Sequence, residues 1–211
     1  MVKVDLHVHS NYSDGRDSVE KLIVAAKEKN MDLIAIVDHG PGHIFGIKPE
    51  EMKNRKNEII EYSDMYEMDV RVGIELDLDI CKTDDLKLWD DSFDLILGSF
   101  HKRCTYEDYF YAVKRSIESI DVLAHHGLTI DDYNDEIELE LIALLRKFDV
   151  AVELNSRRGL PWPSFIRLCA DAGLKYAIGS DAHRAMSVGR VEWAENIAKE
   201  YFDEGDMYLG R

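Results

Sequence analysis

The stretch VKVDLHVHSNYSDG, residues 2–15, joins a short apolar run to two histidines one residue apart. Its β-branched residues predict a strand over Val2–Val8. Residues two apart in a strand share a face, so His7 and His9 point the same way. They are either a chance surface pair or a metal-binding pincer, since neutral imidazole is the commonest ligand of zinc and similar metals. Other parts of the sequence are needed to distinguish these two interpretations.

Length and composition suit one domain spanning residues 1–211. The chain has 211 residues and 45% hydrophobic content, which is enough for a sizeable core. We expect no membrane contact, because no stretch has the apolar length of a membrane span and no secretory signal begins the chain. The three widely spaced cysteines predict reduced thiols and a cytoplasmic location; they are Cys81, Cys104 and Cys169.

The formal net charge of −16 argues against the broad phosphate-tracking surface of a nucleic-acid-binding protein. It leaves room for a small local anion site. It also fits a protein that binds several divalent cations. Much of the acidity, as in TIDDYNDEIELE (residues 129–140), is more simply a solvated surface.

Short apolar runs alternate with amphipathic stretches along the chain. The expected strands are Val2–Val8, Asp32–Val37, Val70–Leu76, Leu95–Ser99, Val122–Ala124, Val150–Leu154 and Tyr176–Gly179. The expected helices are Ser18–Lys29, Pro49–Met65, Tyr106–Glu118, Glu136–Lys147, Pro163–Ala172 and Ser187–Phe202. This alternation predicts an α/β fold with a parallel sheet. Because a full barrel typically has eight units in about 250 residues, seven units in a shorter chain predict a smaller or distorted relative.

Residues of metal-binding types stand where the predicted strands end. Along the chain they are His7 and His9, His39, Glu75, His101, His125, and Asp181 and His183, while the sixth strand delivers Glu153 and Asn155. In a parallel barrel these strand ends meet on one face, where active sites are built. A lone histidine such as His43 or His126 is more often a packed residue, but the set of strand-terminal residues predicts a metal site.

The set is larger than one metal needs. A zinc ion takes three or four protein ligands, so more than one metal is implied. Nitrogen and carboxylate oxygen without thiolate suit Zn, Mn or Fe. Two ions about 3.5–4 Å apart could share Glu75 as a bridge and clamp a phosphoester oxygen, and a bound water of lowered pKa would supply the nucleophile.

Six motifs resemble those of the PHP family, named for its polymerase and histidinol-phosphatase members. They are DLHVHSNYSDG, VDHG, GIELD, GSFH, LAHHG and GSDAHR, in the family order at strand ends between residues 5 and 184. The resemblance implies a TIM-barrel-like, distorted seven-stranded (β/α)7 barrel of PHP type that holds two or three divalent metal ions. It also brings Asp14 into the site, although its SDG setting alone reads as an ordinary turn.

The resemblance implies three ligand sets. One metal would be held by His7, His9, Glu75 and Asp181, a second by Glu75, His101 and His125, and a third by Asp14, His39 and His183. The catalytic residues would be Glu75, His101, Asp181 and His183. Two positions depart from the pattern: Asp14 stands where some members have histidine, and the fifth motif reads HHG, so that His125 or His126 is the ligand. His43 has no clear place.

Three arginines follow the predicted strand ends. Arg184 comes directly after His183, and Arg157 and Arg158 follow the sixth strand. Solvent exposure is the default for arginine. Their position favours phosphate recognition, because a guanidinium binds phosphate oxygens in a fork. We expect Arg184 and at least one of the other two to bind substrate.

These observations favour a metal-dependent phosphoric monoester hydrolase that acts on a small phosphorylated metabolite. Histidinol phosphate is the best-known substrate of stand-alone PHP proteins, and its cationic amine suits an acidic protein; it would place the enzyme in histidine biosynthesis. A PHP-type exonuclease or nucleotide phosphoesterase is the alternative, disfavoured by the charge of −16. A non-catalytic regulatory metal-binding module is disfavoured further because the ligand set is retained. The oligomeric state is left open.

Overall fold

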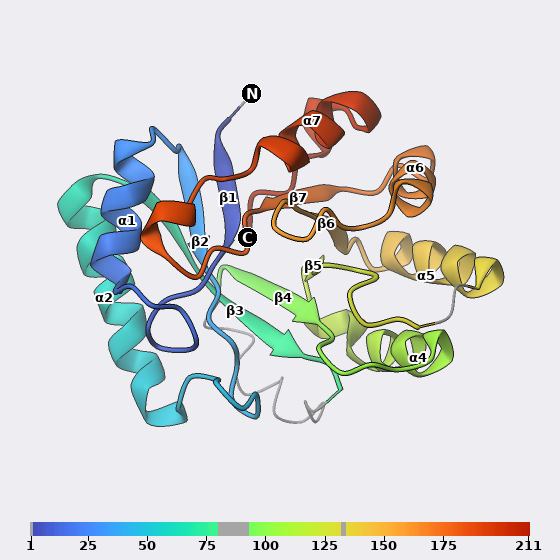
Figure 1. The fold of residues 1–211 in the computed structure, drawn as a ribbon, viewed down its shortest axis with the longest axis horizontal. Coiled ribbons are helices and arrows are strands. Elements are labelled where there is room, and N and C mark those ends of the chain that lie inside the picture. Colours follow the sequence, from blue (N-terminus) through green and yellow to red (C-terminus); the bar gives the residue numbers. More distant parts are fainter. Residues whose placement is uncertain (1, 80–92, 132–133) are drawn as a thin grey trace.

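The protein is described by a computed structural model that covers residues 2–79, 93–131 and 134–211. Its strands form one parallel sheet in which each strand pairs with the next along the chain, from β1 to β7 (Figure 1). Their bounds are β1 Val4–Val8, β2 Leu33–Ile36, β3 Asp69–Asp77, β4 Leu95–Ser99, β5 Val122–Leu123, β6 Ala151–Asn155 and β7 Tyr176–Gly179.

The first and last strands meet through a short contact that nearly closes the sheet. Val8 pairs with Ala182 in an isolated bridge, and the amide of Ala182 donates to the carbonyl of His7 at 3.1 Å. The buried carboxylate of Asp5 accepts hydrogen bonds from the amide and the hydroxyl of Ser180, at 2.8 and 2.6 Å. The expected distorted seven-stranded barrel is thereby confirmed.

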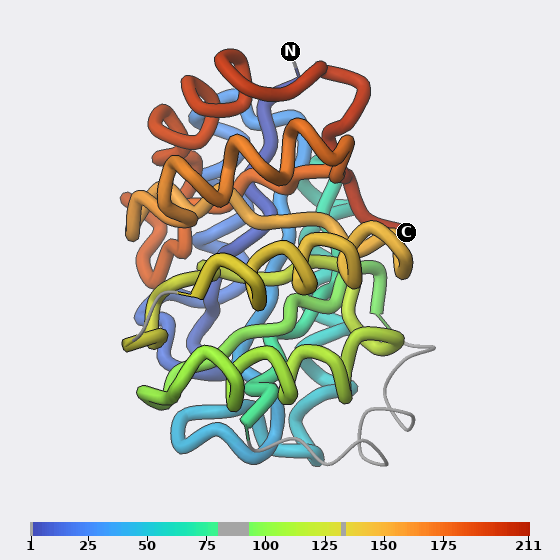
Figure 2. Tube along the Cα trace, turned by 90° about the vertical axis from the view of Figure 1, so that its right-hand side faces the viewer, coloured from blue at the N-terminus to red at the C-terminus, as the bar shows by residue number. Residues whose placement is uncertain are grey.

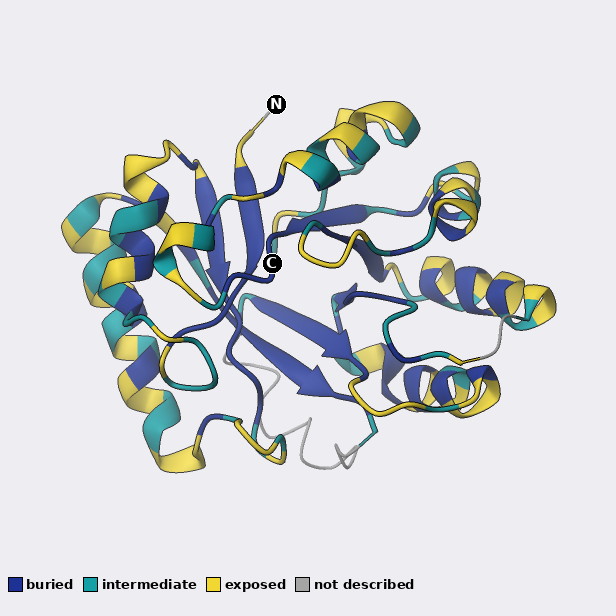
Figure 3. Cartoon of the chain, viewed as in Figure 1, coloured by how far each residue is buried: buried dark blue, intermediate teal, exposed yellow. Residues whose placement is uncertain are grey.

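The helices lie outside the strands. Their bounds are α1 Val19–Glu28, α2 Met52–Tyr66, α4 Tyr106–Ser116, α5 Asp135–Lys147, α6 Pro163–Asp171 and α7 Glu192–Tyr201. The helices α4 to α7 stack side by side along one flank, and α1 and α2 cover the opposite flank (Figures 1 and 2). Their inward faces are buried and their outward faces exposed (Figure 3). Within the described residues, none of these helices is both long and apolar enough to cross a membrane.

Helix starts follow local capping chemistry. The side chains of Ser18, Thr105 and Asn134 each accept a hydrogen bond from an amide in the first turn of α1, α4 and α5. The prediction of a helix over 187–202 is wrong at its start, since α7 begins at Glu192. Gly189 takes a φ of 71°, which lies outside the helical region, and residues before it form a separate 3₁₀ turn.

Burial of the strands places the site at one end of the barrel. Every residue of β1, β2, β4, β6 and β7 is buried, as expected when helices cover a parallel sheet. The apolar side chains from strands and helices form one core. Polar side chains therefore gather where the strands end, at their carboxyl ends.

Candidate metal centre

The carboxylate of Glu75, at the end of β3, lies at the centre of the predicted site and is 1% exposed. Its Oε2 atom lies 2.9 Å from His39 Nδ1 and 3.4 Å from His9 Nε2. Its Oε1 atom lies 3.0 Å from His125 Nε2 and 3.6 Å from His101 Nε2. The two oxygens thus face different histidines, which is the arrangement that a carboxylate bridging two cations requires.

The potential ligand atoms form overlapping groups whose members lie within 4.8 Å of one another. Three of these groups are His7, His9 and Glu75; Glu75, His101 and His125; and His9, Asp14, His39 and His183. They parallel the three sets that the family resemblance implies, with His9 added to the third. Asp181, the ninth predicted ligand, has its Oδ1 atom 4.0 Å from His9 Nε2. The structure therefore brings all nine together, and their roles as ligands stay a prediction.

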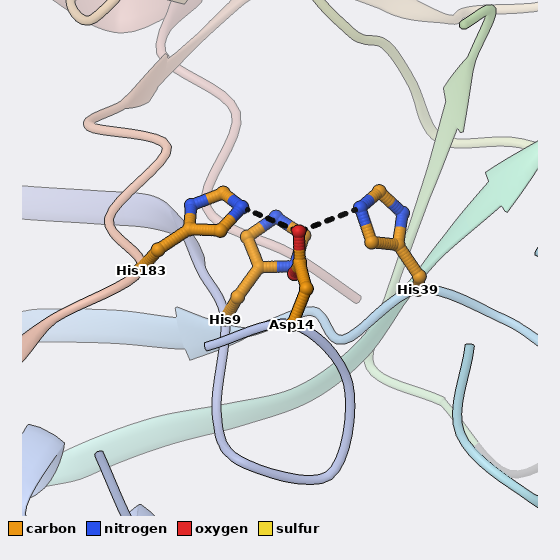
Figure 4. A group of neighbouring side chains, drawn as sticks. All are labelled: His9, Asp14, His39 and His183. Atoms are coloured by element: carbon orange, nitrogen blue, oxygen red, sulfur yellow. Dashed lines mark hydrogen bonds and ion pairs between the residues drawn. The ribbon is translucent and has the colours of Figure 1, made fainter. Parts of the chain in front are cut away.

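Asp14 connects the third group. Its Oδ2 atom accepts from His183 Nε2 at 3.0 Å and lies 3.8 Å from His39 Nε2 (Figure 4). Its Oδ1 atom lies 3.6 Å from His9 Nδ1. Figure 4 shows the carboxylate between the rings of His183 and His39, with His9 behind it. The SDG segment is therefore part of the site and not an isolated surface turn.

Two carboxylates orient histidines toward Glu75. His7 Nδ1 lies 2.6 Å from Glu153 Oε1, and His101 Nδ1 is hydrogen-bonded to Asp77. The Nε2 atoms of both rings then face Glu75, a pairing that commonly orients metal-binding histidines. Glu153 thus lies behind His7 and also accepts from the amide of His125 at 2.7 Å. Sequence analysis missed Asp77, although its place two residues after Glu75 puts it on the same strand face.

The buried side chain of Asp38 holds the loop that carries Asp14 in place through hydrogen bonds. The Asp38 carboxylate accepts from the amide and the hydroxyl of Ser10, both at 2.7 Å, and from the hydroxyl of Ser13 at 2.6 Å. Arg55 Nε donates to the same carboxylate at 2.6 Å, and both side chains are buried. Neither Asp38 nor Arg55 was predicted from the sequence. The one available signal is that Asp38 directly precedes His39.

Burial and charge set the protonation of the centre. Although burial favours a neutral carboxyl, His39 and His7 hold the pKa of Glu75 well below its usual range. Burial alone would lower the pKa of His7, but Glu153 and Glu75 raise it well above the usual value. Burial lowers the pKa of His9 well below its usual value. Glu75 is therefore ionised and His9 neutral, which are the forms that bind metals, whereas a metal would displace a proton from His7.

The residues present fit divalent ions. Among the buried polar atoms of the described residues that lack a hydrogen-bond partner are His9 Nδ1, Asp14 Oδ1, His39 Nδ1, Glu75 Oε2 and His125 Nδ1. Buried polar atoms normally make hydrogen bonds, so a cluster of atoms that make none indicates another kind of partner. All five belong to the predicted ligand set. Cations bound among them would satisfy several of these atoms.

The adjacent histidines His125 and His126 point into different environments. His125 takes a φ of 29°, in the left-handed region that non-glycine residues rarely occupy, and its ring faces Glu75. The His126 ring stacks on Phe165 at 4.0 Å, and its Nδ1 lies 2.9 Å from Tyr109 Oη. Burial lowers the pKa of His126 to about 3. The geometry therefore favours His125 as the ligand and His126 as a core residue.

His43, which the sequence left without a role, lies at the rim of the centre. Its ring stacks on His39 at 3.9 Å, and its Nε2 lies 3.6 Å from Asp77 Oδ2. It also groups with His39 and His101 as a possible ligand. His43 is thus part of the same polar cluster.

A cavity of about 280 Å³ opens over the centre. Arg157 and Arg158 line it, and both contact Asp181: Arg157 Nη1 donates to Oδ1 at 3.1 Å, and Arg158 Nε lies 3.5 Å from Oδ2. Arg184 is not among the described residues that line this cavity. It lines a neighbouring cavity instead. Two of the three predicted arginines therefore face the metal centre directly.

A parallel barrel with a histidine- and carboxylate-rich centre at its strand ends defines a class of metal-dependent proteins whose active sites occupy that face. The chain belongs to the PHP domain family, whose family model matches residues 5–204. The resemblance inferred from the six motifs is thus confirmed.

Similar proteins include a DNA polymerase and several probable phosphatases. The chain is 28% identical over 221 residues to the DNA polymerase/3'-5' exonuclease PolX of Bacillus subtilis, covering 96% of this chain but only 38% of PolX. It is 27% identical over 233 residues to a probable phosphatase of Thermoanaerobacter sp. strain X514, covering 98% of this chain and 89% of the relative.

Among solved structures, the histidinol phosphate phosphatase of Lactococcus lactis, complexed with Zn, L-histidinol and phosphate, has a TM-score of 0.73. The match covers 96% of this chain and 95% of the other at 20% identity, so it shows a shared fold. Together with the family match, these findings support a metal-dependent phosphoesterase of PHP type.

Proposed function

We propose that the protein, as a single domain over residues 1–211, is a metal-dependent phosphoric monoester hydrolase that acts on a small phosphorylated metabolite. The observation that carries this proposal is the buried Glu75 carboxylate, each of whose oxygens faces a different set of histidines. Bound there, two or three divalent ions (Zn, Mn or Fe) would act as Lewis acids and lower the pKa of a coordinated water. The nine ligands would be His7, His9, Asp14, His39, Glu75, His101, His125, Asp181 and His183.

The chain's own residues would position the ester. Arg157 and Arg158 are 44% and 40% exposed in the cavity above the centre, where their guanidinium groups can bind non-bridging phosphate oxygens. Among the predicted histidine ligands, His101 and His183 have the most exposed side chains. Their rings would therefore border the bound substrate. Together with Glu75 and Asp181 they form the proposed catalytic set.

Histidinol phosphate is the first candidate substrate to test. The support is the likeness to the L. lactis histidinol phosphate phosphatase, together with the acidic charge of this chain. With that substrate, the reaction would belong to histidine biosynthesis in the cytoplasm.

Phosphate release from metal-loaded protein tests the proposal. Protein reconstituted separately with Zn²⁺, Mn²⁺ or Fe²⁺ is assayed against histidinol phosphate and a panel of small phosphate monoesters. We expect turnover that a chelator abolishes and that added metal restores. Fully metal-loaded protein that releases phosphate from no ester in the panel would contradict the proposal.

A nucleotide phosphoesterase or exonuclease is the second candidate, because the match to PolX covers 96% of this chain. The same metal-loaded protein is assayed on oligonucleotides with 3'- and 5'-labelled ends. Removal of nucleotides at a rate above that of ester hydrolysis would replace the first proposal with this one. Stoichiometric metal binding without turnover on either class would favour a non-catalytic metal-binding module.

A further inference from the structure

A second cavity, of about 470 Å³, adjoins the one above the metal centre. The two cavities share Arg157, Asp181 and His183 as lining residues. Beyond this shared wall, the second cavity is lined by Arg184 and Arg190, with Trp193 and Ser187 among the others. A molecule whose phosphate lies at the metal centre can therefore extend past Arg157 into a space bordered by two further guanidinium groups.

The segment 184–190, which carries these two arginines, is held in place by the carboxylates of Asp5 and Asp17 and by the ammonium group of Lys29. Its backbone amides donate to Asp17 at 2.9 Å and to Asp5 at 2.8 Å. The ammonium group of Lys29 donates to two of its carbonyls, at 2.9 and 2.5 Å. The backbone beneath the guanidinium groups is thus fixed before any ligand binds, which reduces the ordering cost of binding.

The arginines of the two cavities differ in their partners. Arg157 and Arg158 both contact the carboxylate of Asp181. By contrast, across the ranges 2–79, 93–131 and 134–211 the side chains of Arg184 and Arg190 have no hydrogen bond or ion pair. Both side chains are exposed, as is common for arginine, and both line the second cavity. An acidic group of a ligand would supply the missing partner.

We propose that this second cavity is a subsite for a second acidic group of the substrate, a carboxylate or a non-reacting phosphate. The inference rests on the proposed phosphatase function and narrows its substrate class to phosphate monoesters with a further anionic group. The reacting phosphate would lie at the metal centre beside Arg157, and the second anion would contact Arg184 and Arg190. Trp193 would border the connecting part of the molecule.

The proposed subsite predicts which charge is favoured on the second group of the substrate. A primary amine in the same space would face two guanidinium groups, and like charges at close range repel. Among the described residues, the one acidic side chain that lines this cavity beyond Asp181 is Glu192, which is exposed. Histidinol phosphate, whose far end is cationic, is therefore expected to be a poorer substrate than an acidic ester of similar length.

A matched series of esters tests the subsite. Linear alkyl phosphates of about three to six carbons carry a terminal hydroxyl, amine, carboxylate or second phosphate, and kcat/KM is measured on the metal-loaded protein. A charge-assisted contact predicts that the acidic members exceed the hydroxyl member by about ten- to a hundredfold. Arg184→Gln and Arg190→Gln should each reduce this ratio about tenfold. Arg167→Gln, on the exposed face of α6, is the matched control and should leave the ratio unchanged.

A binding measurement separates this proposal from the proposed function. Metal-loaded protein is titrated calorimetrically with a non-hydrolysable carboxyalkyl phosphonate, and we expect Arg190→Gln to weaken binding about tenfold. Equal kcat/KM for hydroxyl and carboxylate esters, or a preference for the amine, would overturn the subsite while leaving the phosphatase intact. If no ester is hydrolysed, the proposed function fails. The subsite is also overturned if the Arg190→Gln variant binds the phosphonate as tightly as the unaltered protein does.

Discussion

Replacing Arg55 by methionine tests whether a buried ion pair supports the metal centre. Arg55 is 2% exposed, and its Nε atom donates to the fully buried Asp38 at 2.6 Å. Its Nη2 atom donates to the carbonyls of Ile36 and Gly73, at 2.6 and 2.8 Å. Methionine keeps much of the apolar volume but leaves the Asp38 charge and the two carbonyls without these donors.

The expected loss is large. Removing one partner of a buried ion pair costs about 3–5 kcal/mol, because the remaining charge is left uncompensated. Natural domains unfold with free energies of about 5–15 kcal/mol, so the variant would lose a major part of its stability. For a chain of this length, that corresponds to a fall in Tm of roughly 6–20 °C. The effect should also reach the site, because Asp38 fixes Ser10 and Ser13 ahead of Asp14.

Urea unfolding of chelator-treated protein measures the stability, and a metal titration of the folded variant measures the site. Arg71→Met is the matched control, since Arg71 pairs with Asp69 at 2.5 Å on the surface. We expect that control to cost at most about 1 kcal/mol. Adding Asp38→Asn to Arg55→Met should restore part of the stability by removing the uncompensated charge. A loss in Arg55→Met no larger than in Arg71→Met would refute the reasoning.

Three further predictions concern the ligands, the arginines and the core. Protein never exposed to chelator should carry two or three metal ions per chain by elemental analysis. The Glu75→Gln variant should lose at least one of these ions together with most of its turnover. One ion or none in the unaltered protein would contradict the multinuclear site. Arg157→Ala should lower kcat/KM for phosphate monoesters by about ten- to a hundredfold at unchanged metal content, because a charge-assisted contact is lost; an unchanged kcat/KM would remove Arg157 from the site. Burial lowers the pKa of His126 to about 3, so the unfolded imidazole takes up a proton below about pH 6.5 that the folded one does not. As the pH is lowered from about 6.5 to about 3, the unfolding free energy of chelator-treated protein should therefore decrease by about 1.4 kcal/mol per pH unit more than that of His126→Phe. Equal slopes for the two proteins would show that His126 does not stay neutral in the fold.

The barrel was predictable because its strands are short and, apart from the start of β3, buried. Most read as a largely apolar run with a polar residue at or near its end, as where His101 comes two residues after Leu95–Ser99. Apart from the starts of α2 and α7, the predicted element ends lie within two residues of those observed; α2 begins at Met52, because Pro49–Glu51 form a separate 3₁₀ turn. The α7 start could not be read from periodicity, because Gly189 takes its left-handed conformation where its amide donates to Asp5, 184 residues away in the chain.

The convergence of the candidate ligands was predictable, but their orientation was not. Strand ends place His7 and His101 on one face of the barrel, and this follows from parallel topology alone. The ring orientations depend on Glu153 and Asp77, which come from other strands. Likewise, HHG does not reveal which histidine turns toward Glu75, since the left-handed backbone of His125 decides it. Sequence spacing gives the strand and the face, while long-range hydrogen bonds give the direction.

These long-range contacts share one chemical feature, a buried carboxylate. Asp5 joins the start of β1 to Ser180 after β7, Asp38 holds the loop that carries Asp14, and Glu153 holds His7 and the amide of His125. A cluster of imidazoles close to protonation would repel itself, and a metal would compete with protons for each ring. Glu153 holds the ring of His7, and Asp77 holds that of His101, without help from a cation. Part of the acidity that the sequence displays as net charge therefore supports the barrel ends. In the proposed subsite, Arg184 and Arg190 would select the substrate by its charge.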